Sequence, residues 1–100
     1  MTPRTSSFLM ANLGSEVTGI FLASHEKKGG QVAQLQTRAK KILDEIISLP
    51  DMATRKNEMA LLEQVIRDIA SPDPLYQVDK ESLEEYFSPF AIRVLSQNSQ

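Results

Sequence analysis

The sequence predicts an all-α protein, a small up-down helical bundle of three main helices and a C-terminal pair of short helices. Apolar residues recur at alternating steps of three and four along successive stretches, the spacing that lines one face of an α-helix. Glycine and proline separate these stretches from one another. A chain of 100 residues with 41% hydrophobic and 24% charged side chains has the size and composition of one globular domain. We therefore expect a single helical domain over residues 1–100, frayed at 1–6 and 97–100.

The strongest periodic signal lies in residues 31–70. Two helices are expected there, at about 31–49 and 53–70, because Pro50 ends the first and Asp51 or Thr54 can cap the second. Their stripes comprise Val32, Leu35, Ala39, Ile42, Ile46 and Leu49 in the first helix and Met59, Leu62, Ile66 and Ile69 in the second. The two stripes predict a helical hairpin that acts as a scaffold for the rest of the chain.

A preceding helix is expected over about residues 7–28, with Ser6 or Ser7 as its N-cap. Lys27 and Lys28 suit a helix C-terminus, where cations offset the helix dipole. Gly29-Gly30 then breaks the helix. Short links of this kind favour antiparallel packing of neighbouring helices.

This helix carries two uncharged arcs. The first is apolar, and the second consists of small or uncharged side chains, namely Ala11, Gly14, Ser15, Thr18 and Leu22. Gly14 and Gly19 each cost about 1 kcal/mol relative to alanine, a cost that is often offset where two helices approach closely. We expect burial on two sides and take the second arc as a candidate interface with a second copy, so that the protein forms a homodimer. The alternative is a poorly optimised helix, or one broken near Gly14.

The C-terminal third begins with the breaker Ser71-Pro72-Asp73-Pro74, followed by an extended or irregular stretch over 75–78. Asp79 is expected to cap a short helix over 80–87, and Ser88-Pro89 to start another over 89–96. The aromatic segment 86–90 is expected to pack as a lid on the 31–70 hairpin. Its alternative role is an exposed anchor for a partner protein.

The residues exclude several kinds of chemistry. No cysteine is present, which rules out disulfides, thiolate catalysis and cysteine zinc sites. The single histidine, His25, is expected to be solvated near a helix end, and only a cleft holding it beside two buried carboxylates would indicate an enzyme. Gly29-Gly30 lacks the motif of a phosphate-binding loop. We expect no catalytic residue, no metal site and no cofactor.

One concentration of positive charge remains, formed by Lys27, Lys28, Arg38, Lys40 and Lys41, of which Lys27, Lys28, Arg38 and Lys41 are the candidate binding residues. It predicts either a solvated face or a site for an anion, an RNA backbone or an acidic partner. The net charge of −2 argues against a general nucleic-acid binder. No stretch is long and apolar enough to span a membrane, and no signal peptide is visible, so we expect a cytoplasmic protein.

The sequence therefore predicts a non-enzymatic helical protein–protein interaction module, acting through its surface or its homodimer. The alternative is an anion- or RNA-binding accessory protein that uses the basic residues of 27–41. No residue pattern in the chain identifies a family.

Overall fold

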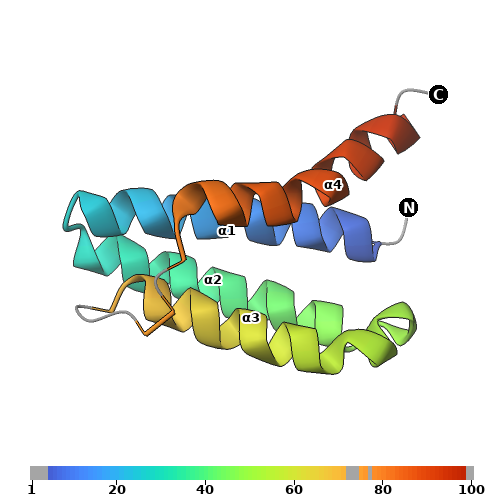
Figure 1. Ribbon diagram of the computed structural model, residues 1–100, viewed down its shortest axis with the longest axis horizontal. Coiled ribbons are helices and arrows are strands. Elements are labelled where there is room, and N and C mark those ends of the chain that lie inside the picture. Colours follow the sequence, from blue (N-terminus) through green and yellow to red (C-terminus); the bar gives the residue numbers. More distant parts are fainter. Residues whose placement is uncertain (1–4, 72–74, 77, 99–100) are drawn as a thin grey trace.

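The computed structural model describes residues 5–71, 75–76 and 78–98. The helices in these ranges are α1 (Ser6–His25), α2 (Gly29–Ile47), the 3-10 helix η1 (Pro50–Arg55), α3 (Lys56–Ile69) and α4 (Lys80–Asn98). Successive α-helices run in opposite directions along the long axis of a molecule of 42 × 27 × 24 Å (Figure 1). The predicted all-α up-down bundle is confirmed, although the number of helices differs from the prediction.

The start of α1 is capped one residue earlier than expected. Thr5, rather than Ser6 or Ser7, caps the helix, because its Oγ1 accepts a hydrogen bond from the backbone N–H of Phe8 at 3.1 Å. The Ser6 hydroxyl instead donates to Oδ2 of Asp51 at 2.7 Å. This bond ties the beginning of α1 to η1. Of the ends predicted to fray, residues 1–4 and 99–100 lie outside the described residues, whereas Ser6 is helical and α4 reaches Asn98.

The turn between α1 and α2 is built by lysine, not by the two glycines. α1 ends at His25, and Lys27 takes a left-handed conformation with φ of 59°. The backbone N–H of Lys28 bonds the carbonyl of Ala23 at 2.9 Å, and that of Lys27 bonds the carbonyl of Ser24 at 3.2 Å. This is the Schellman pattern of helix termination. The prediction that Gly29-Gly30 breaks the helix is therefore wrong, because α1 ends at His25 and both glycines already belong to α2.

The hairpin of α2 and α3 follows the predicted stripes. Their buried members, with Leu43 and Val65 added, are Val32, Ala39, Leu43, Ile46, Met59, Leu62, Val65 and Ile66. The link between the helices differs from the prediction. Pro50 starts η1, Asp51 lies in the first turn of η1, and no side chain caps α3. The expected caps are wrong because a turn of 3-10 helix precedes α3 and ends at Arg55.

The C-terminal segment is one helix rather than two. α4 runs through Pro89, which is exposed, while Phe87 and Phe90 on either side of it are buried. A proline removes one backbone hydrogen bond and bends a helix without having to end it when packing holds both halves. Figure 1 shows the second half of α4 turning away from α1.

The link before α4 agrees with its prediction where it is described. The carboxylate of Asp79 accepts a hydrogen bond from the backbone N–H of Ser82 at 2.7 Å, which confirms the cap. Leu75 and Tyr76 are irregular. Residues 72–74 and 77, which belong to the predicted breaker and irregular stretch, lie outside the described residues.

α1 packs on α2 and also on α4, and α1 and α4 lie side by side and antiparallel (Figure 1). Gly14 is buried, and a Cβ atom placed on it would lie 2.9 Å from both Cβ and Cγ of Phe87. Only a glycine permits that approach. Phe87 and Phe90 of the aromatic segment are buried and Tyr86 is half-buried, which favours the core interpretation over the exposed anchor. The segment packs chiefly on α1 and less on the α2–α3 hairpin, where the lid was expected.

A methyl group at Gly14 is expected to destabilise the protein. Cβ of Phe87 cannot rotate away, so Gly14→Ala must push α4 off α1, at a cost of about 1–3 kcal/mol that exceeds the gain in helix propensity. Gly19→Ala is the matched control, because its Cβ would meet only the flexible end of the Leu35 side chain, with Cδ1 at 3.2 Å and Cδ2 at 3.4 Å. The free energies of unfolding in urea test this. A stability of Gly14→Ala equal to or above that of Gly19→Ala would contradict the packing.

Replacing Lys27 with glycine is expected to stabilise the protein. A left-handed conformation costs a non-glycine residue about 1–2 kcal/mol, and glycine does not pay this cost. Glycine also makes the unfolded chain more flexible, which offsets part of the gain. The free energy of unfolding of Lys27→Gly should therefore rise by about 0.5–1 kcal/mol. Lys28→Gly removes the same charge at a φ of −96°, where glycine offers no relief, and should not stabilise. Thermal and urea unfolding of the two variants distinguish the backbone effect from the loss of charge.

Candidate functional site

The four predicted anion-binding residues do not gather in one place. Lys27 and Lys28 lie at the α1–α2 turn, where Lys28 Nζ pairs with Oε2 of Glu26 at 2.8 Å. Arg38 lies ten residues further along α2, about 15 Å away along the helix axis. A guanidinium nitrogen of Arg38 pairs with Oε1 of Glu16 on α1 at 3.0 Å. Two of the four cations are thus matched with carboxylates of the same chain.

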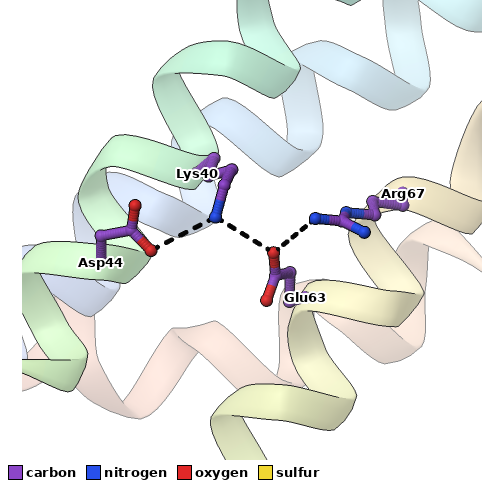
Figure 2. Close-up of polar contacts among 4 residues, drawn as sticks. All are labelled: Lys40, Asp44, Glu63 and Arg67. Atoms are coloured by element: carbon purple, nitrogen blue, oxygen red, sulfur yellow. Dashed lines mark hydrogen bonds and ion pairs between the residues drawn. The ribbon is translucent and has the colours of Figure 1, made fainter.

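Lys41 lines a different surface, a groove of approximately 510 Å³ between α2 and α3. Lys40 joins the two helices there, with its Nζ 3.4 Å from Oδ1 of Asp44 and 3.3 Å from Oε1 of Glu63 (Figure 2). Arg67 donates to the same Glu63 oxygen at 2.8 Å. The hydrogen bond to Glu63, and next the charge of Asp44, raise the pKa of Lys40. These charges balance one another and lie near solvent, so they link the helices without forming an anion site.

Most of the predicted small-residue face of α1 lies against α4, and one of its five residues lies outside that contact. Ala11, Gly14, Ser15 and Thr18 line a shallow depression of approximately 210 Å³ whose other wall is formed by Leu83 and Phe87 of α4. Leu22, the fifth residue of the face, lies beyond this depression and is 53% exposed. The two-sided burial expected for this helix is present within one chain. A bulky residue at Gly14 would therefore test the docking of α4 rather than contact with a second copy.

A partly buried polar cluster links α3 to α4. Nε of Arg55 donates to Oε1 of Glu58 at 2.9 Å, and the hydroxyl of Tyr86 also donates to Glu58. The bonded guanidinium lowers the pKa of the Glu58 carboxyl, whereas burial, and next the bond to Glu58, raises the pKa of the Tyr86 hydroxyl. The guanidinium of Arg55 also lies 5.6 Å from the ring centre of Phe90. The cluster positions the middle of α4.

The largest hollow described lies at the end of the bundle where α1 and α3 finish and α4 begins. It measures approximately 590 Å³ and takes its walls from three helices and the link before α4. Its lining is mainly apolar, with polar groups at the rim. The lining residues are Phe21, Leu22, Ser24, His25, Glu26, Val65, Asp68, Ile69, Tyr76, Val78 and Lys80. We refer to this hollow as the end cleft.

The polar groups of the end cleft are mostly engaged. Asp68 accepts hydrogen bonds from the backbone N–H groups of Leu75 at Oδ1 and Tyr76 at Oδ2, both at 2.9 Å. Glu26 pairs with Lys28. His25 is exposed, as predicted, and the two carboxylates that line the hollow with it are not buried and already have donors. The arrangement differs from the buried acid and base groups that would have indicated an enzyme.

Sequence reasoning missed most of the end cleft. Tyr76, Val78 and Lys80 follow a proline-rich link, and no periodic pattern relates them to His25 or Val65. The only available signal was Leu22, an apolar residue beside a polar helix end.

Two further apolar residues, Ile92 and Leu95 in the second half of α4, are 58% and 68% exposed. They were assigned to a short final helix that the proline was expected to separate.

No family model, curated protein or solved structure matches the chain. Within the described residues, no helix combines the length and apolar character needed to cross a bilayer. The same residues contain no group of three or more histidine, aspartate or glutamate side chains placed to hold a metal ion.

Removing the Tyr86 hydroxyl is expected to destabilise the protein by about 1 kcal/mol at neutral pH, a value reduced by the partial exposure of Glu58. Folding lowers the pKa of Glu58 below its ordinary value of 4.5. The ionised carboxylate therefore contributes to stability above pH 4.5, and this contribution is lost as the pH falls through the lowered pKa of the folded state. Glu58→Gln should therefore flatten the acid limb of the stability profile, and Tyr86→Phe should have less effect in that variant. Glu85→Gln, at an exposed position of α4, is the control. An unchanged acid limb in Glu58→Gln would contradict the assignment.

Proposed function

We propose that the protein is a non-enzymatic helical interaction module that forms a homodimer through the second half of α4. The observation that carries the proposal is the exposure of Ile92 and Leu95, 58% and 68%, on a helix half that diverges from its own bundle (Figure 1). Neighbouring apolar side chains that remain in water on a projecting helix favour burial against another molecule.

The charge distribution favours a second copy as the occupant. From Pro89 to Asn98, α4 carries one charged residue, Arg93, and the neighbouring first half of α1, from Ser6 to Ser15, carries none. The guanidinium of Arg93 lies over the ring of Phe90, 5.4 Å from its centre. A two-fold contact places the same patch against itself, so a nearly neutral apolar patch avoids the repulsion that a charged one would suffer.

Other surfaces of the chain suit self-association less well. The first half of α4 exposes Glu81, Glu84 and Glu85, and two copies of that face would repel each other. The small-residue face of α1 already contacts α4. The anion- or RNA-binding alternative has less support, because Lys28 and Arg38 neutralise acidic neighbours.

Sedimentation velocity over a range of protein concentrations tests the proposal. The wild-type chain is expected to dimerise, and Ile92→Asp combined with Leu95→Asp to weaken the dimer at least tenfold. Both residues are exposed, so the helical circular dichroism of the variant should be unchanged. Leu61→Asp, at a 52% exposed position of α3, is the matched control and should dimerise as the wild type does. A monomeric wild type, or a double variant that still dimerises, would overturn the proposal.

A further inference from the structure

The bundle is open on the side between α3 and α4. α1 packs against α2, α3 and α4, and α3 packs against α2, whereas α3 and α4 hardly approach each other within the described residues. Apolar side chains nevertheless surround a hollow of approximately 170 Å³ on this side, which we call the side hollow. Its lining residues are Glu58, Leu61, Leu62, Val65, Val78, Leu83 and Tyr86.

The side hollow and the end cleft follow one another along α3. Val65 and Val78 line both of them. Leu61, one turn before Val65, lines only the side hollow, and Ile69, one turn after it, lines only the end cleft. The two hollows are therefore displaced by about 6 Å along the helix axis, the rise of four residues. We refer to the two together as the apolar groove.

This spacing matches the side chains of another helix. Residues four apart lie on one face of a helix and about 6 Å apart along its axis, so two apolar side chains at i and i+4 can enter both hollows together. The side hollow is smaller than the roughly 300 Å³ at which small-molecule pockets begin, and it suits a single side chain. Leu61 at the side hollow and Leu22 at the end cleft are 52% and 53% exposed, so the groove leaves apolar surface in water.

The charge around the apolar groove favours a basic partner. Three ion pairs beside it cancel within the chain, namely Lys80 with Glu84, Arg55 with Glu58 and Lys28 with Glu26. His25 adds no formal charge at pH 7. Asp68 accepts its hydrogen bonds from neutral backbone N–H groups of the link, which do not cancel its negative charge. Glu81 and Glu85 lie one turn apart on α4, the other wall of the groove, and both are exposed. The charge that remains is therefore negative.

We propose that the apolar groove binds a basic amphipathic helix of a partner protein, with two large apolar side chains at i and i+4 in the two hollows. Lysine or arginine residues beside them face Asp68 and Glu85. The apolar lining supplies affinity, and the carboxylates select a basic helix over an acidic one. Neither Ile92 nor Leu95 lines the groove, so this contact does not rest on the proposed dimer.

Titration of the full chain with a synthetic peptide, followed by backbone amide chemical shifts, tests the proposal. The peptide is alanine-based, about 15 residues long so that it can form a helix, and carries two leucines at i and i+4 flanked by lysines. Saturable shifts are expected at the residues of both hollows.

Two control peptides should bind at least tenfold more weakly. In one, the leucines stand two positions apart and point to different sides of the helix, and in the other, glutamate replaces lysine. Absence of saturable shifts with the first peptide, or equal affinity for it and either control, would overturn the proposal.

Three variants locate the site. Leu61→Lys places a cation at an exposed position of the groove and should weaken binding of the lysine peptide at least tenfold. Leu95→Lys, the same substitution in the second half of α4, should leave it unchanged, whether or not it weakens the proposed dimer. Glu85→Lys should weaken the lysine peptide about two- to fivefold and strengthen the glutamate peptide.

Equal effects of Leu61→Lys and Leu95→Lys on peptide binding would show that the peptide binds elsewhere and would refute the site. Sedimentation velocity of Leu61→Lys tests the other occupant of the groove. Loss of a dimer in this variant would assign the groove to a second copy of the chain and would also overturn the proposal.

Discussion

The close approach of α4 to α1 at Gly14 is the contact on which the rest of the structure depends. It allows Phe87 to pack directly on the α1 backbone and so brings Leu83 and Phe90 into the core. α1 is thereby enclosed by α2 on one side and α4 on the other. A side chain at this position would separate the helices and would also displace the link that closes the end cleft.

Ion pairs and charged hydrogen bonds join the outer faces of neighbouring helices. Glu16, Glu58 and Glu63 each bridge two elements, and each takes up a cation or a hydroxyl that the sequence alone would offer to a ligand. Such exposed pairs add little stability individually. Among the basic residues of 27–41, Lys28, Arg38 and Lys40 pair with carboxylates of the same chain.

The two ends of the bundle consequently differ in character. At one end, α4 bends near Pro89 and carries exposed Ile92 and Leu95 beyond its contact with α1. At the other, the ends of three helices and the link before α4 surround a mainly apolar hollow whose polar lining includes both acidic and basic side chains. Pro89 lies within α4, and the carboxylate of Asp68 accepts backbone hydrogen bonds from the link.

The sequence by itself determined the helical class, the antiparallel order and the buried stripes of α2 and α3, because periodicity and breakers act over a few residues. It also located the Asp79 cap, and it left open whether the aromatic segment 86–90 is core or exposed. Only the tertiary structure decided that Lys27 forms the turn, that α4 continues through Pro89, and that α4 fills the small-residue face of α1. Those outcomes depend on packing between residues far apart in the chain. The end cleft belongs with them, since His25, Val65 and Lys80 meet only after the helices have packed.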